Sequence, residues 1–178
     1  MIEIGSLRPD DRAAWEALAR GYKRFYRTEV PDEGYEEMWR RLRRGDEVHA
    51  VGARVDGELA GIAHYLFHAT CWAAESCYLQ DLYVAEAARG RGAARALIER
   101  VAEAARERGA ARLYWTTRED NVTARALYDK VAACNGFVRY DHPLAQRGPA
   151  ARGPAARARH RVAPPDACLE EGSPGRLG

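Results

Sequence analysis

A glycine-rich turn between a strand pattern and a helix pattern constrains the fold of this chain more than any other feature. Residues 79–84, LQDLYV, are mostly apolar, and residues 89–92, RGRG, follow after a short connection. Apolar residues then recur at helical spacing from Ala94 to Ala105. The first N–H groups of a helix lack partners within it, and together with the helix dipole they form a site for an anion. The turn therefore predicts a strand, an anion-binding loop and a helix in succession.

The residue pattern of this turn leaves two interpretations open. Glycines at 90 and 92 let a phosphate approach the backbone, and Arg89 and Arg91 can add charge-assisted hydrogen bonds. Alternatively, the glycines only permit a tight bend. Neither G-x-x-x-x-G-K-[ST] nor a complete G-x-G-x-x-G is present, so the turn by itself identifies no nucleotide-binding family.

The other patterns predict an α/β protein with a mixed, mostly antiparallel sheet and helices on both faces. The expected strands are 2–7, 48–55, 59–67, 78–85, 112–117 and 137–140, and the expected helices are 9–26, 31–42, 93–109 and 121–135. Asp56-Gly57, between two strand patterns, is a strong signal for a hairpin turn. The predicted order is β-α-α-β-β-β-α-β-α-β.

Composition argues against membrane and nucleic-acid partners. No apolar run approaches the roughly 20 residues that span a bilayer, and the N-terminal residues do not form a signal peptide, so we expect a cytoplasmic protein. The net charge is +2, and the first 140 residues hold 22 basic and 22 acidic side chains, which gives no bulk preference for nucleic acid. Cys71, Cys77, Cys134 and Cys168 lack metal-ligand spacing, so no metal site is expected.

The composition of the chain changes sharply after Tyr140. Residues 144–178 contain no Phe, Tyr, Trp or Ile and include the run RGPAARGPAARARHR. Such a segment has very little apolar surface to bury. We therefore expect one globular domain over residues 1–143 and a disordered tail over residues 144–178.

Two motifs at the right separation resemble those of the GNAT acyltransferase superfamily. Arg-x-x-Gly-x-Ala at residues 89–94, after LQDLYV, is similar to the superfamily's acetyl-CoA pyrophosphate loop. Residues 121–128, NVTARALY, are similar to its N-x-x-A-x-x-L-Y segment, and Gly136-Phe137 resembles its usual helix exit. The resemblance covers about residues 1–142. It implies a GNAT-like fold that uses acetyl-CoA as co-substrate and needs no metal.

The resemblance also implies roles for individual residues. Contacts to acetyl-CoA would come from Leu82, Tyr83, Val84, Arg89, Gly90, Arg91, Gly92, Ala93, Ala94 and Asn121. Backbone N–H groups of residues 82–84 would stabilise an oxyanion. Tyr128 would protonate the departing thiolate, or else serves only as a core tyrosine. Asp81 is the carboxylate nearest the expected transfer point, either as a catalytic or substrate-binding group or as the partner of an arginine.

Within the superfamily, GIAHYLFHATCW at residues 61–72 and the following YLQDLYV most resemble the spermidine/spermine and small-amine acetyltransferases. That branch has a glutamate where this chain has Gln80, and glutamine cannot act as a base. His64 and His68 are alternative bases, although strand histidines without a catalytic role are the simpler interpretation. The acidic residues of the N-terminal helices and their link either form a solvated face or attract a cationic amine; they are Glu29, Asp32, Glu33, Glu36 and Glu37.

We therefore expect an N-acetyltransferase, an acyltransferase that moves the acetyl group of acetyl-CoA directly to a primary amine. The acceptor would be a small molecule: a polyamine or diamine, an amino acid or a related amine. A homodimer is compatible with the sequence, which leaves the oligomeric state open. Two alternatives come from other classes: a CoA-binding sensor without turnover, and a nucleic-acid-binding protein that uses the Arg/Gly-rich segments.

Overall fold

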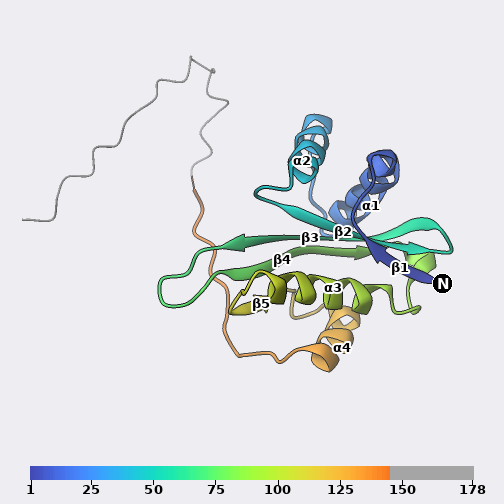
Figure 1. The fold of residues 1–178 in the computed structure, drawn as a ribbon. Helices are drawn as coiled ribbons and strands as arrows, with labels where there is room; N and C mark the ends of the chain where they lie inside the picture. The colour runs from blue at the N-terminus through green and yellow to red at the C-terminus, as the bar shows by residue number, and fades with distance from the viewer. Residues whose placement is uncertain (145–178) are drawn as a thin grey trace, which may run out of the picture. The chain divides into compact units, whose positions relative to one another are not determined.

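A five-stranded sheet organises residues Met1–Gly136, which form one unit of the computed structural model; the structure describes residues 1–144 (Figure 1). The strands are β1 Ile2–Gly5, β2 His49–Val55, β3 Glu58–His68, β4 Ser76–Val84 and β5 Arg112–Tyr114. The helices are α1 Arg12–Phe25, α2 Asp32–Arg44, α3 Ala93–Glu107 and α4 Val122–Val131, with short 3₁₀ helices at Pro9–Asp11 and Glu86–Ala88. The strand order is β1-β2-β3-β4-β5, antiparallel throughout except for the parallel pair β4–β5.

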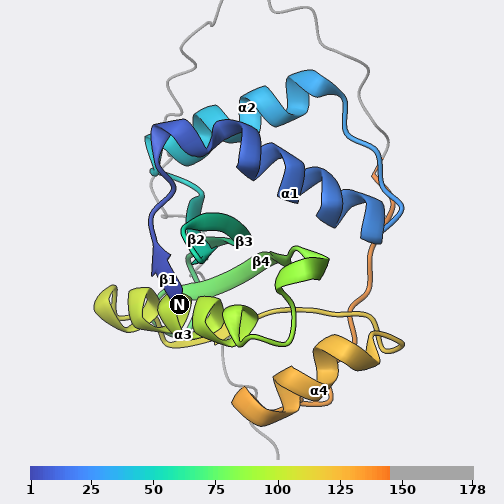
Figure 2. The same ribbon diagram turned by 90° about the vertical axis from the view of Figure 1, so that its right-hand side faces the viewer.

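The two faces of the sheet are covered by different helices (Figures 1 and 2). On one face α1 and α2 bury an aromatic cluster that contains Trp15, Tyr35 and Ile62. On the other face α3 packs its apolar stripe, with Leu97 and Val101 fully buried, and α4 contributes partly buried residues. Two cores on opposite faces of one sheet follow directly from the alternation of side chains along the strands.

A β-bulge interrupts this alternation in β4. Tyr65 of β3 pairs with Leu79, whereas the preceding His64 pairs with Asp81, so Gln80 is an extra residue on β4. Leu79 therefore stays in the core beneath α3, while Asp81 turns toward α1. The bulge changes which side chains of β4 point to each face at the position where the site is expected.

The strands β4 and β5 separate after a short parallel pairing. Their register extends only from Ser76 opposite Arg112 to Tyr78 opposite Tyr114. β4 continues to Val84, and beyond Tyr78 no described strand pairs with this edge. Its backbone groups are therefore left for other partners.

The predicted fold class is confirmed, and the Asp56-Gly57 hairpin forms with both residues at positive φ, 55° and 93°. The predicted strand over 137–140 is wrong, because no strand is assigned there. The mostly apolar run FVRY supplies side chains suited to a strand, but whether a strand forms depends on pairing with a neighbouring strand. The predicted strand 112–117 ends early, at Tyr114, because β4 and β5 diverge there.

The α4 helix is also shorter than predicted, since it ends at Val131 and Ala132 is already extended. The predicted tail lies outside the described residues except for Leu144, so the domain boundary at 143 stays a prediction. Within residues 1–144, no helix combines the length and the apolar character needed to cross a bilayer.

Candidate functional site

A cavity of about 350 Å³ lies between the helices α1 and α2 and the face of β3 and β4. Its aromatic walls come from Trp15, Tyr22, Tyr35 and Tyr65, and its other polar side chains are Lys23, Glu37, Arg41, His64, Gln80 and Asp81. Two cationic and two anionic side chains therefore face a space that is otherwise lined mainly by aromatic and aliphatic side chains. Such a cavity suits a small ligand that carries charge of either sign.

A chain of hydrogen bonds connects the buried wall of this cavity to Asp81. The indole Nε1–H of Trp15 donates to His64 Nε2 at 2.9 Å, and His64 Nδ1 lies 2.9 Å from Asp81 Oδ2. An indole nitrogen can only donate, so Nε2 must accept and the imidazole proton must reside on Nδ1. His64 is therefore neutral, and its Nδ1–H donates to the carboxylate of Asp81.

Opposing effects act on the pKa of Asp81. Burial by itself would raise the pKa, but the hydrogen bond and the electrostatic interaction with His64, the hydrogen bond from Tyr22 and the positive charge of Lys23 together outweigh it, so the pKa lies below its ordinary value. Burial, and then the charge of Asp81, raise the pKa of Tyr22, which therefore remains a donor. Asp81 is thus a carboxylate at neutral pH, suited to bind a cation and poorly suited to accept a proton.

The glycine-rich turn forms the start of α3. Gly92 is the N-cap residue with φ of 92°, Gly90 has φ of 75°, and no side chain caps the helix. A Cβ atom at either glycine would meet nothing within 4 Å, so the space above the loop is open. Open space above uncapped N–H groups fits the pyrophosphate of CoA.

The two arginines of this loop make contacts within the protein. Arg89 Nε donates to the carbonyl oxygen of Val84 at 3.2 Å, and its guanidinium lies 5.9 Å from the ring centroid of Tyr83. Arg91 Nη2 donates to Asp56 Oδ2 at 2.9 Å, at the tip of the β2–β3 hairpin. Both therefore fix the loop against the sheet.

The remaining predicted contacts to the cofactor divide between the core and the surface. Ala93 is buried beneath the start of α3, and Ala94 is half-buried beside it. Leu82 and Val84 pack in the core beneath α3, whereas Tyr83 packs with the aromatic cluster beneath α1. Because these side chains pack in the two cores, the contacts of residues 82–84 with a ligand would come mainly from backbone groups, and the Val84 carbonyl oxygen already accepts from Arg89.

Tyr128 and Asn121 occupy different positions on α4. Tyr128 is half-buried against the ring of Trp115, and burial raises the pKa of Tyr128 to about 12. Asn121 is the N-cap residue: its Oδ1 accepts from the Ala124 N–H at 3.4 Å, and its Nδ2 donates to Thr117 Oγ1 at 3.1 Å. Asn121 thus has a structural role in starting α4.

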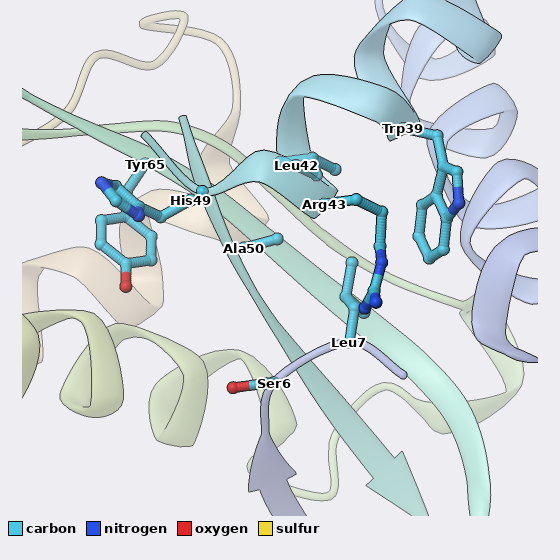
Figure 3. A pocket seen from close by; sticks show the side chains of 9 residues that line it. Ser6, Leu7, Trp39, Leu42, Arg43, His49, Ala50 and Tyr65 are labelled. Carbon is cyan, nitrogen blue, oxygen red and sulfur yellow. The ribbon is translucent and has the colours of Figure 1, made fainter. Parts of the chain in front are cut away.

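A second cavity, of about 260 Å³, shares only Tyr65 with the lining of the first (Figure 3). His49 and Tyr65 stack at one end of it, and Arg43 lies between Trp39 and Leu7. None of the predicted site residues lines it. Among residues 1–144, no group of three or more His, Cys, Asp or Glu side chains could hold a metal ion.

Trp15, Tyr22, His64 and Asp81 form one hydrogen-bonded cluster, of which Trp15 and Tyr22 were not predicted as site residues. In the sequence, Trp15 and Tyr22 recur at helical spacing within the predicted helix 9–26, which is typical of core residues. A signal was available: they lie seven residues apart, hence on one helix face, and each carries a hydrogen-bond donor. Their partners on β3 and β4 are too distant in sequence to be identified from such a pattern.

Comparison with known proteins gives consistent results. A family model described as Acetyltransferase (GNAT) family matches residues 15–133. The chain is 38% identical over 144 residues to the D-amino-acid N-acetyltransferase HPA3 of Saccharomyces cerevisiae, which covers 78% of this chain and 89% of that protein. It is 29% identical over 134 residues to a thialysine N-epsilon-acetyltransferase of Caenorhabditis elegans, with coverage of 75% and 84%.

Comparison with solved structures identifies the same family. The crystal structure of a ribosomal-protein-alanine N-acetyltransferase from Brucella melitensis biovar Abortus 2308 matches with a TM-score of 0.68 and 25% identity, over 81% of this chain and all of that one. The segment matched by the family model includes the glycine-rich turn, Asp81 and Tyr128. The predicted resemblance is confirmed: this chain belongs to the GNAT family of acetyltransferases.

Proposed function

We propose that this protein transfers the acetyl group of acetyl-CoA directly to the primary amine of a small molecule. The observation that carries the proposal is the position of Asp81, a carboxylate at neutral pH that lines the cavity beneath α1 and α2. It lies on β4, whose free edge and following loop supply the expected contacts to acetyl-CoA. Both substrates can therefore be held together, which provides much of the rate acceleration.

In this mechanism Asp81 binds the acceptor and does not act as its base. A carboxylate with a lowered pKa holds an ammonium group by charge, and water takes the proton that must leave before attack. The amine nitrogen then attacks the thioester carbon, the C–S bond breaks, and the proton that the nitrogen loses ends on the sulfur. Gln80 takes no part in proton transfer, because an amide is not a base.

Residues of β4, α3 and α4 would assist this reaction from the side of the cofactor. Acetyl-CoA supplies an activated acyl group on a good leaving thiolate. Backbone N–H groups of Leu82–Val84 donate to the carbonyl oxygen as negative charge develops on it. The uncapped start of α3 at Gly92 binds the pyrophosphate. Tyr128 donates a hydrogen bond to the departing sulfur.

The charges of the cavity favour an acceptor that carries both an ammonium and a carboxylate. Lys23 and Asp81 face the cavity with opposite charges, while Glu37 and Arg41 are already ion-paired with Arg40 and Glu47. The cavity is thus balanced in charge, whereas a polyamine would favour a cavity with excess negative charge. Two relatives are named for amino-acid acceptors, D-amino acids and thialysine. We therefore propose an amino acid or a close analogue as the acceptor and place polyamines second.

The test is release of CoA thiol from acetyl-CoA against a panel of D- and L-amino acids, thialysine, polyamines and aminoglycosides. We expect the fastest release with an amino acid, and mass spectrometry should find one acetyl group on its amine. Tight binding of acetyl-CoA without acceptor-dependent thiol release would instead favour a CoA-binding sensor. Steeply salt-dependent retention of RNA or DNA would favour the nucleic-acid alternative.

A further inference from the structure

The innermost residue of the hydrogen-bonded cluster, Trp15, is the most deeply buried of its members. Trp15 has no exposed surface, and His64 has a residual exposure of 4%. The Trp15 ring lies 5.2 Å from that of Trp39, which holds it against the second helix. Both residues contribute to the lining of the cavity, yet their side chains are almost completely buried, so their hydrogen bond joins two buried groups of the folded core.

This hydrogen bond selects one of the two neutral forms of the imidazole. With the proton on Nδ1, His64 accepts from Trp15 and donates to Asp81, and both contacts are favourable. With the proton on Nε2, two donors would face each other at Trp15 and two acceptors at Asp81. A buried mismatch of that kind is costly, since each unsatisfied group loses its hydration without a replacement partner.

We propose that Trp15 is a positioning residue for the amine acceptor: it holds His64 as the Nδ1–H form, and His64 thereby fixes the Asp81 carboxylate toward the cavity. The inference rests on the proposed function, in which Asp81 binds the acceptor ammonium. It adds that a buried core residue fixes the orientation of the carboxylate that binds the acceptor. Tyr22, which also hydrogen-bonds Asp81, holds the same carboxylate from the side of the cavity.

The first test reads the form of His64 directly. Long-range ¹H–¹⁵N correlation spectra of protein labelled at histidine, with His64 assigned through a His64→Asn variant, distinguish Nδ1–H from Nε2–H. We expect the Nδ1–H form at pH 7.5. The Nε2–H form, or a protonated imidazolium at that pH, would overturn the proposal.

The second test separates positioning from packing. Trp15→Phe keeps an aromatic ring but removes the indole donor, so we expect the KM of the best panel acceptor to rise roughly 10-fold. The kcat and the Kd of acetyl-CoA should stay within about 2-fold, because the cofactor contacts are unchanged. Trp39→Phe is the matched control: it removes a neighbouring indole that does not bond His64, and its acceptor KM should equal that of the wild type. Equal KM values for the two variants would overturn the proposal.

A double-mutant cycle provides the decisive measurement. The amide nitrogen of asparagine corresponds to imidazole Nδ1, so His64→Asn keeps a donor for Asp81 and should raise the acceptor KM less than His64→Leu does. In the His64→Asn background no Nε2 remains to be held, so Trp15→Phe should have almost no further effect. If Trp15→Phe raised the acceptor KM as much in that background as in the wild type, Trp15 would act only through packing, and the proposal would be overturned.

The experiments also separate this inference from the function on which it rests. If the wild type acetylates no amine in the panel, the proposed function has failed, and the Kd of propylammonium, titrated by NMR, replaces KM in every comparison. If Trp15→Phe does not fold, the His64→Asn and His64→Leu pair decides by itself: equal acceptor affinities for the two would overturn the proposal.

Discussion

Tyr128 and Trp115 pack edge to face, with ring centroids 5.3 Å apart and an interplanar angle of 63°. Burial raises the pKa of Tyr128 to about 12, so its hydroxyl remains protonated at every pH at which the protein would work. A thiol has a pKa of about 8.5, so full proton transfer from this hydroxyl is uphill. A strong hydrogen bond to the departing sulfur is therefore its expected contribution.

Tyr128→Phe tests this contribution. The ring and its packing on Trp115 remain, so the melting temperature and the Kd of acetyl-CoA should barely change. We expect the single-turnover rate of acetyl transfer to fall by roughly 10²-fold, the usual scale for losing such a donor. Tyr114→Phe, which removes a hydroxyl bonded to His68, is the matched control and should keep the wild-type rate. A wild-type rate for Tyr128→Phe would leave Tyr128 a core residue only.

Binding of the cofactor at the N-terminus of α3 can be tested with two substitutions of nearly equal size that differ in charge. A side chain at Gly92 is unsuitable, since its φ of 92° would strain any other residue. Ala94→Glu and Ala94→Gln differ only in charge. The glutamate should stabilise α3 through the helix dipole yet bind acetyl-CoA roughly 10-fold more weakly, which is about 1.4 kcal/mol. Calorimetry at two salt concentrations measures this difference; equal affinities would place the pyrophosphate elsewhere.

The pH dependence follows from the pKa of Asp81, which lies below its ordinary value of 3.8. Asp81 therefore keeps its charge above about pH 4 and loses it only as the pH falls through the lowered pKa. The rise of kcat/KM between pH 5 and 9 should then follow the ionisation of the acceptor. Two acceptors whose amine pKa values differ by about one unit should give profiles displaced by that amount. A rise at one fixed pH for both would indicate a base on the protein.

We expect a buried ion pair to contribute to the stability of the fold. Arg54 Nη2 lies 2.6 Å from Asp11 Oδ2, with side-chain exposures of 9% and 12%, and joins β2 to the segment before α1. Asp11→Ala would leave a buried guanidinium without its partner and should cost about 3 kcal/mol in the free energy of unfolding. Asp120→Ala removes one partner of the exposed Arg118 pair and should unfold at the wild-type urea midpoint. Coincident midpoints for the two variants would refute the argument.

Local patterns account for what the sequence analysis predicted correctly. The Asp56-Gly57 hairpin and the strand–turn–helix at Gly92 depend on residues close together in the chain, whose conformational preferences decide the structure. The bond between Trp15 and His64 joins positions 49 apart, and no local pattern records it. The helical spacing of Trp15 is typical of a core position, and it gives no sign of the hydrogen bond to His64.

The features that were predicted wrongly or not at all also depend on contacts between segments that are distant in the sequence. Phe137–Tyr140 has the side chains of a strand, but pairing depends on a neighbouring edge that the sequence does not identify. Likewise, LQDLYV carries no mark of the extra residue at Gln80, because the bulge is a property of the pairing between two strands. Prediction from one sequence is therefore strongest where a single segment decides and weakest where two segments must agree.

At the bulge, the presence of Gln80 and the chemistry of its side chain have separate roles. The sheet needs an additional residue at this position to turn Asp81 toward α1, but the Gln80 side chain itself is exposed and lines the cavity. The bulge requires an additional residue at this position, but it does not require a particular side chain, so the side chain is available to contact a ligand. We therefore expect substitutions of Gln80 to change the range of accepted amines while the fold stays intact.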